Sequence, residues 1–246
     1  MAVVWRAGRD GVEYEVRRQG RTLRLYANGV QHSEFHPQRL VTGSVWDLLW
    51  LPVLLGEPDH LRRVLVLGLG GGSLIPPLRR LVDPLAMVAV ELDPLHLEVA
   101  EQQFGVGEFG VETVCADAVE WVNAYDGPPF DLVVEDLFAP SNTNVTRAVP
   151  ASKRWLQQLQ ALVSPRGMLV MNFGDWAEYR RSDATVKPKG WGSGFRLATP
   201  DCHNAVIVWT RQTTSSKALR RRVQADEELA RELALGRLDY SIRQLF

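Results

Sequence analysis

Short apolar runs alternate with amphipathic stretches between residues 64 and 173, and this alternation constrains the fold more than any other feature. The runs VLVLG, MVAVELD, VETVCAD, DLVVEDLF and MLVMNFG have the length and composition of buried strands, whereas LHLEVAEQQF and KRWLQQLQALV have helical periodicity. Apolar strands that alternate with helices are typical of a parallel sheet covered on both faces. The pattern therefore predicts an α/β domain.

The two ends of the chain depart from this pattern. FRLATP and NAVIVWT are separated by a short link, which predicts an antiparallel strand pair, and SSKALRRRVQADEELARELALGRL then predicts one amphipathic helix. Residues 12–31 alternate between apolar and polar side chains, with Asn28-Gly29, a dipeptide favoured in tight hairpin turns. We therefore predict an N-terminal β-hairpin appendage over residues 1–43 and a main domain over residues 44–246, which begins with an apolar helix at 44–56.

The first apolar strand runs directly into a glycine-rich turn. Gly68 ends VLVLG, and Gly70, Gly71 and Gly72 follow before the next helical stretch. Glycine permits positive φ and lets a ligand approach the main chain, and the N–H groups of the following helix N-terminus attract hydrogen-bond acceptors. The turn is a candidate nucleotide-binding element, although Ser73 replaces the last glycine of the dinucleotide fingerprint and the lysine of a P-loop is absent.

Acidic residues stand at the ends of the next three strands. Glu91 follows the glycines by about 20 residues, where a carboxylate can accept hydrogen bonds from both ribose hydroxyls. Asp117 ends VETVCAD, where it can meet an adenine amino group, and Asp136 ends DLVVEDLF. Each acid alone has a plainer interpretation as a helix N-cap or loop residue. Together with the glycine turn they predict one nucleoside cleft, because ligands bind beyond the carboxyl ends of parallel strands.

Composition narrows the class of protein further. The net charge of −1 gives no global basic field, so we expect no nucleic-acid partner. The two cysteines fit a reducing cytoplasm, and the N-terminus lacks the apolar core of a signal peptide. No apolar run reaches transmembrane length, so we expect no membrane contact. The five scattered histidines predict no metal site, and no motif of a nucleophilic enzyme is present.

This order of parts resembles a class I S-adenosylmethionine-dependent methyltransferase domain, specifically the spermidine-synthase-like branch. The resemblance extends from about residue 12 to 210: LRLYANGVQHSE is similar to the family segment L-x-L-D-G-x-x-Q-x-T-E, and GLGGGSL, AVELDPLHLEVAEQQF, CADAVEWV and FDLVVEDLFAP follow in order. It implies a Rossmann-like, seven-stranded methyltransferase sheet with a terminal antiparallel hairpin. It also implies S-adenosylmethionine, its decarboxylated form or methylthioadenosine as the ligand.

The resemblance assigns roles to the residues of the predicted cleft. Glu91 would bind the ribose, Asp117 the adenine, and the turn Gly68–Gly72 the amino-acid portion of the ligand. The ELDP and CADA motifs also place Asp93 and Ala118 in the predicted cofactor site. A homodimer is a further implication, since family relatives are commonly dimers.

Three departures from the aminopropyltransferase motifs bear on the reaction. Gly70 takes the place of the aspartate in G-G-G-D-G-G, which faces the aminopropyl amine of decarboxylated S-adenosylmethionine in those enzymes. In D-S/T-x-D-P, Asp136 keeps the first aspartate, but Ala139 replaces the second, before Pro140. The Tyr-(His/Gln)-Glu-Met segment, which helps to hold the polyamine, is roughly replaced by SVWD at residues 44–47.

These departures favour the intact cofactor and methyl transfer. Each amine of a polyamine carries a positive charge, and removing its partner from a desolvated site costs a few kcal/mol. Gly70 leaves room for the carboxylate of S-adenosylmethionine beside backbone N–H donors. Asp136 is the predicted catalytic residue, which would orient or deprotonate an amine acceptor. GLGGGSL with its E-x-D element is also similar to the spermidine-synthase-like domain of certain eukaryotic protein methyltransferases.

Two alternatives stay open at this point. One is a divergent aminopropyltransferase in which other residues supply the missing charges. The other is a non-catalytic protein that binds a nucleoside and regulates or scaffolds a partner. Residues 172–176, NFGDW, are either part of an acceptor pocket or a packed loop. The acceptor itself has no transferable sequence signature, because loops carry its specificity.

Overall fold

The computed structural model describes residues 1–139 and 146–246. Its centre is a sheet in the order β14-β12-β13-β11-β8-β5-β6-β7, in which the five strands from β11 to β7 are parallel. The strands are β5 (Arg63–Leu67), β6 (Ala86–Glu91), β7 (Glu112–Cys115), β8 (Phe130–Glu135), β11 (Val163–Phe173), β12 (Ser193–Ala198), β13 (Ala205–Thr210) and β14 (Ser241–Gln244).

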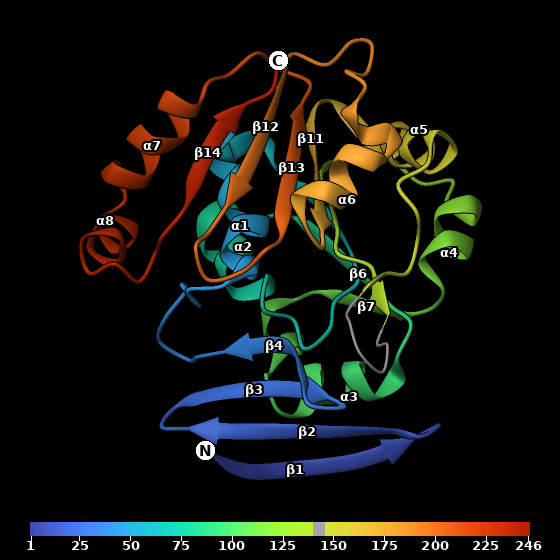
Figure 1. Cartoon of the computed structure of the whole chain (residues 1–246), viewed down its shortest axis with the longest axis vertical. Helices are drawn as coiled ribbons and strands as arrows, with labels where there is room; N and C mark the ends of the chain where they lie inside the picture. Colours follow the sequence, from blue (N-terminus) through green and yellow to red (C-terminus); the bar gives the residue numbers. More distant parts are fainter. Residues whose placement is uncertain (140–145) are drawn as a thin grey trace.

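Helices cover both faces of this sheet (Figure 1). Alternate side chains of β5 point to opposite faces, so Val64 and Val66 pack with one set of helices and Leu65 and Leu67 with the other. The first set is α1 (Val45–Trp50), α2 (Ile75–Val82), α3 (Pro94–Gln102), α7 (Ser216–Ala225) and α8 (Glu227–Ala234). The second set is α4 (Ala118–Ala124), α5 (Lys153–Leu162) and α6 (Trp176–Arg181).

The predicted fold class is confirmed, including the antiparallel pair β12–β13, but two details differ. The sheet has eight strands instead of seven, because β14 pairs with β12 and extends the edge. The predicted single terminal helix is two helices. Asp226 is extended and caps α8 by accepting hydrogen bonds from the N–H groups of Glu228 and Leu229, which separates α8 from α7.

The N-terminal part is a four-stranded antiparallel sheet, larger than the predicted hairpin. Its strands β1 (Ala2–Arg9), β2 (Val12–Gln19), β3 (Thr22–Ala27) and β4 (Val30–Phe35) pair in chain order. The predicted turn at Asn28-Gly29 joins β3 to β4. A second turn of the same kind, Asp10-Gly11, has φ of 51° and 78° and joins β1 to β2. Figure 1 shows this sheet stacked across one end of the large sheet.

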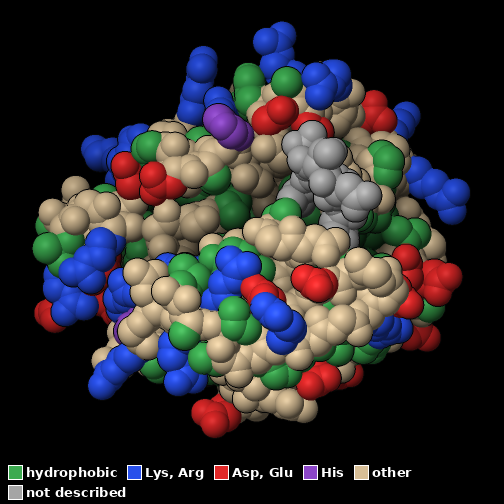
Figure 2. Space-filling model, turned by 60° about the horizontal axis from the view of Figure 1, so that its bottom comes forward, with side chains coloured by type: hydrophobic (Ala, Val, Ile, Leu, Met, Phe, Trp, Pro, Cys, Tyr) green, Lys and Arg blue, Asp and Glu red, His purple; other side chains and the backbone are tan. Residues whose placement is uncertain are grey.

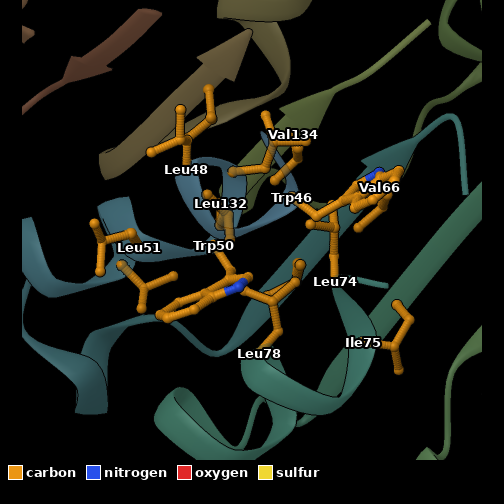
Figure 3. Packing of buried hydrophobic residues seen from close by; sticks show 14 of the residues in the cluster. Trp46, Leu48, Trp50, Leu51, Val66, Leu74, Ile75, Leu78, Leu132 and Val134 are labelled. Carbon is orange, nitrogen blue, oxygen red and sulfur yellow. The ribbon is translucent and has the colours of Figure 1, made fainter. Parts of the chain in front are cut away.

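Residues 44–56 connect the two sheets and enter the core. They were predicted as one apolar helix, and they form α1 followed by a 3₁₀ turn over Leu51–Leu55 that contains Pro52. Trp50 is fully buried, and Figure 3 shows it in one cluster with side chains of α2, β5 and β8. This packing fixes α1 against the sheet. The division at residues 43 and 44 into two domains stays a prediction.

The surface shows no separation of charge on the face that carries the N-terminal sheet. Figure 2 shows Lys and Arg side chains interspersed there with Asp and Glu. In the part of the chain that the structure describes, no helix combines the length and the apolar character needed to cross a bilayer.

Candidate active site

The described residues line a partly open cavity of about 640 Å³ beyond the carboxyl ends of β5, β6, β7 and β8. This is the place that open parallel sheets offer to ligands. The N-terminal sheet supplies another wall through Val12 and Tyr14 of β2 and Gln31 and His32 of β4. Seven of the nine predicted site residues line the cavity: Gly68, Gly70, Glu91, Asp93, Asp117, Ala118 and Asp136.

Only glycine fits at position 68, because the turn after β5 lies very close to the ends of β6 and β8. Its N–H donates to the carbonyl of Val90 at 2.9 Å, and the N–H of Asp136 donates to the carbonyl of Leu67 at 2.8 Å. The φ of Gly68 is +86°, and a Cβ at this position would lie 2.2 Å from the backbone oxygen of Asp136. A side chain here would therefore push β8 and Asp136 away from the turn.

Gly70 and Glu91 are held together by a direct hydrogen bond. The N–H of Gly70 donates to Oε2 of Glu91 at 2.7 Å, and the N–H of Asp93 donates to Oε1 at 3.0 Å. Burial raises the pKa of the Glu91 carboxyl, but His96 and the N–H groups of Asp93 and Gly70 outweigh it and hold that pKa below its ordinary value. The carboxylate is thus kept ionised beside the glycine turn.

Gly71 and Gly72 lie behind the cavity wall. A Cβ on Gly71 would lie 2.5 Å from a ring carbon of Phe104, and one on Gly72 would lie 2.5 Å from a methyl group of Val106. These two glycines let the turn pack closely on the segment that follows α3. Neither glycine is among the residues that line the cavity, and their cofactor-binding role stays a prediction.

The expectation of N–H donors beside Gly70 also needs correction. The Gly70 N–H is engaged by Glu91, and the Gly71 N–H donates to Oγ of Ser33 at 2.6 Å. Both amides are therefore already bonded within the protein. Because Ser33 belongs to β4, the N-terminal sheet holds the glycine turn in place, which the sequence patterns did not indicate.

Asp93 and Asp117 both cap helices at the cavity wall, which for Asp117 agrees with its plainer interpretation as a helix N-cap. Oδ1 of Asp93 accepts from the N–H of Leu95 at 2.9 Å, and its other oxygen accepts from the hydroxyl of Tyr14. Both bonds to Asp117, from the N–H groups that open α4, use Oδ1. Ala118 follows as the first residue of α4 and is buried. The cofactor-binding roles of all three stay predictions.

Asp136 lies on the other side of the glycine turn, at the end of β8. Nδ2 of Asn172 donates to Oδ1 of Asp136 at 2.8 Å, and Nδ2 of Asn204 donates to Oδ1 of Asn172 at 3.0 Å. This chain of amides fixes the orientation of the carboxylate. Burial raises the pKa of Asp136 to about 6, against the opposing effect of the Asn172 hydrogen bond. Asn172 thus belongs to the site, whereas Phe173 is fully buried in the core.

Glu135, the residue before Asp136, forms a buried ion pair with Arg147. Glu135 is fully buried, and Nη1 of Arg147 donates to its Oε2 at 2.8 Å while Nε1 of Trp155 donates to its Oε1 at 3.2 Å. Arg147 also donates to the backbone carbonyl of Asn172. The pair therefore ties β10 (Thr146–Arg147) to the ends of β8 and β11.

Sequence reasoning missed the contribution of two histidines. The rings of His32 in β4 and His96 in α3 lie 5.1 Å apart, and Nδ1 of His96 is 3.6 Å from Oε1 of Glu91. Burial, followed by the proximity of His96, lowers the pKa of His32 to about 4. Both histidines line the cavity. A histidine inside the apolar face of a predicted helix, as in LHLEVA, is the signal that indicates His96.

Asp47, the acid of the SVWD segment, is turned away from the cavity. Its carboxylate accepts from the N–H groups of Thr42 and Gly43 and from Nε1 of Trp50, and its side chain is buried. It therefore orders the start of α1 and is not among the lining residues. Ala139 does line the cavity, and Pro140 lies outside the described residues. In the two described ranges, 1–139 and 146–246, no group of three or more His, Cys, Asp or Glu is placed to hold a metal.

Sequence comparison identifies two kinds of relative, while no protein-family model matches the chain. The eEF1A lysine and N-terminal methyltransferase homolog of Drosophila melanogaster is 31% identical over 132 residues, which cover 51% of this chain and 20% of that protein. The polyamine aminopropyltransferase of Mycobacterium tuberculosis is 31% identical over 171 residues, which cover 66% of this chain and 31% of that protein. The chain thus spans between a fifth and a third of the length of these relatives.

Solved structures of the same two kinds superpose on this chain. A probable spermidine synthase from Corynebacterium glutamicum has a TM-score of 0.72 at 16% identity, covering 99% of this chain and 91% of that one. Human methyltransferase-like protein 13, solved in complex with SAH, has a TM-score of 0.58 at 22% identity, covering 76% and 92% of the two chains. The predicted resemblance is therefore confirmed: this chain has the spermidine-synthase-like form of the class I methyltransferase fold.

Proposed function

We propose that this chain is an S-adenosylmethionine-dependent transferase of spermidine-synthase-like type, and that the group it transfers is methyl. The observation that carries the proposal is the cavity in which a glycine turn, Glu91, Asp117 and Asp136 converge from neighbouring strand ends. Its relatives by sequence are methyltransferases and an aminopropyltransferase. As part of the same proposal we place the protein in the cytoplasm, since Cys115 and Cys202 are unpaired thiols.

The cavity suits an adenosyl sulfonium compound. An ionised carboxylate at Glu91 has acceptor capacity beyond its two backbone bonds, and Oδ2 of Asp117 is not used by the helix cap. The Nε2 atoms of His32 and His96 are buried without a hydrogen-bond partner among the described residues. Buried polar atoms without partners in a cavity wall favour a polar ligand there. We assign the ribose to Glu91, the adenine to Asp117 and the amino-acid portion to the side of Gly70.

Two features support methyl transfer over aminopropyl transfer. A Cβ at Gly70 would lie 2.8 Å from Oγ of Ser33 and 3.1 Å from the carbonyl of His32, so the aspartate of the aminopropyltransferase motif does not fit this turn. Asp47 is committed to the start of α1, so it supplies no charge for a polyamine. S-adenosylmethionine would supply an electrophilic methyl group on its sulfonium, and the protein would mainly have to align an acceptor with it.

Asp136 is the residue best placed to act on an acceptor. Its carboxylate faces the cavity and is oriented by Asn172, which leaves the other oxygen for a ligand. A carboxylate with a raised pKa is a stronger base than an exposed one, so Asp136 can hold an acceptor amine and receive its proton.

Product analysis tests the proposal. The protein is incubated with S-adenosylmethionine or its decarboxylated form and a panel of amines, and the nucleoside product is identified by mass spectrometry. S-adenosylhomocysteine together with a methylated amine is the expected result. Methylthioadenosine together with an extended amine would replace the proposal by aminopropyl transfer. Tight cofactor binding without turnover on any acceptor would instead favour a non-catalytic regulator.

A further inference from the structure

The acceptor half of the cavity, defined as the part beyond β8 and β11, has an apolar lining around one acid. Asp136 is the carboxylate, and the amides of Asn172 and Asn204 stand beside it. The rest of the wall is apolar and comes from α1 and from the chain on either side of β9 (Phe138–Ala139) and β10: Val45, Trp46, Leu137, Phe138, Ala139, Ala148 and Val149.

The carboxylates near this half are committed to other partners. Glu135 is bonded to Arg147 and Trp155 beneath the cavity. Glu178 accepts from the N–H of Gly174 at 2.6 Å and is not among the lining residues. A second cation in the acceptor half would therefore lose its hydration without gaining a described carboxylate.

The carboxylates of the nucleoside half, beyond β6 and β7, bond to protein groups, and the acceptor capacity left on Glu91 and on Oδ2 of Asp117 is assigned to the cofactor. Glu91 holds two backbone N–H groups, and Asp93 holds one together with the Tyr14 hydroxyl. Asp10, on the β1–β2 turn, is paired with Arg9 at 3.3 Å. The cofactor assigned above would stand between these acids and the acceptor.

We propose that the acceptor is an amine with one positive charge on an apolar body, and that the cavity disfavours di- and polyamines. This inference rests on the proposed function and names the substrate class of the same site. The single ammonium pairs with Asp136, and the apolar remainder is buried against Trp46, Phe138 and Val149. A second ammonium on the same carbon chain would lie against this apolar wall, where an unpaired charge is strongly disfavoured.

Two amines of equal chain length isolate the effect of the second charge. n-Butylamine and putrescine are titrated by calorimetry into the protein saturated with S-adenosylhomocysteine, so the readout is binding and not turnover. We expect n-butylamine to bind at least about tenfold more tightly than putrescine. Phenethylamine should bind more tightly than n-butylamine, because its ring buries more apolar surface.

A charge-restoring variant provides the complementary test. Ala139→Asp adds a carboxylate to the acceptor half and should raise putrescine affinity at least about tenfold. Val186→Asp is the matched control, because it adds the same charge at an exposed position outside the cavity and should leave both affinities unchanged. A thermal unfolding scan establishes that both variants are folded.

The outcomes separate this inference from the proposed function. Preference for n-butylamine, reversed or abolished by Ala139→Asp, supports it. Equal or tighter binding of putrescine to the unmodified protein overturns it, and so does the binding of neither amine while S-adenosylhomocysteine binds, in which case the cofactor assignment survives. If S-adenosylhomocysteine itself does not bind, the proposed function fails and this inference falls with it.

Discussion

Replacing Glu91 by glutamine removes one charge from the centre of the proposed cofactor site while keeping the shape of the side chain. In the structure the carboxylate accepts from the N–H groups of Gly70 and Asp93 at 2.7 and 3.0 Å. An amide has one acceptor oxygen and an NH₂ group, so it can satisfy one of these donors and must oppose the other. The change therefore weakens the proposed hydrogen bonds to the ribose hydroxyls and also the hydrogen bond that joins residue 91 to the N–H of Gly70 or of Asp93.

The size of the effect follows from the strength of charge-assisted hydrogen bonds. A hydrogen bond to a charged group contributes about 1.5–3 kcal/mol and a neutral one about 0.5–1.5 kcal/mol, so two ribose bonds lose about 2–3 kcal/mol together. Glu91→Gln should then weaken S-adenosylmethionine binding about 30-fold to 150-fold. The unsatisfied N–H should also lower the free energy of unfolding by about 1–3 kcal/mol.

Calorimetric titration of S-adenosylmethionine measures the first effect and chemical denaturation the second. Glu112→Gln is the matched control, since Glu112 is exposed at the start of β7 and is not a lining residue. Its affinity should equal that of the parent protein. If Glu91→Gln binds S-adenosylmethionine as tightly as the control does, Glu91 does not hold the ribose and the assignment of the nucleoside half is wrong.

Three further changes test the structural support of the site. Gly68→Ala should lower the free energy of unfolding by about 2–4 kcal/mol in a denaturant titration, because positive φ and a 2.2 Å approach to the Asp136 carbonyl both oppose a Cβ; parental stability would contradict the strand-end geometry. Arg147→Met should lower the free energy of unfolding by about 3–5 kcal/mol, because it leaves the charge of Glu135 buried and unpaired. Adding Glu135→Leu to the same chain should recover most of that loss. A much smaller effect of Arg147→Met alone would show that the two side chains do not form a buried ion pair. Turnover should rise with pH through about 6 as Asp136 ionises, and Asp136→Asn should remove that step in a pH–rate profile. Because the folded-state pKa of Asp136 is raised, its contribution to stability is lost between about pH 4 and pH 6 as pH rises, so the free energy of unfolding of Asp136→Asn should fall less over this range than that of the parent protein. The buried Asp47 contributes in the same direction in both proteins.

The parallel part of the fold could be predicted because its signal is local. Five apolar runs with helical stretches between them specify a covered parallel sheet, and this is where β5 to β8 and β11 lie. The first strand, β1, gave little signal because its side chains are mostly exposed and lack a clear alternation of apolar and polar residues. β14 is only four residues long and has one buried side chain, Ile242.

In the candidate site, too, the features with a local sequence signal could be predicted and the contacts between distant segments could not. The glycine turn and the acids at strand ends could be predicted, since their function depends on position along single strands. The bond from Gly71 to Ser33 and the approach of His32 to His96 join segments that are 38 and 64 residues apart, and no periodic pattern encodes them. The packing of Gly71 and Gly72 could not be predicted for the same reason, since Phe104 and Val106 meet the turn only in three dimensions.

A crystal structure of the protein with S-adenosylhomocysteine would show whether Glu91 binds the ribose. Both ribose hydroxyls are expected within about 2.6–3.2 Å of the Glu91 carboxylate. The adenine amino group is expected beside Oδ2 of Asp117, and the vacated methyl position is expected to face Asp136. A nucleoside bound elsewhere, or bound in this cavity with its ribose turned away from Glu91, would contradict the assignment of the ribose to Glu91.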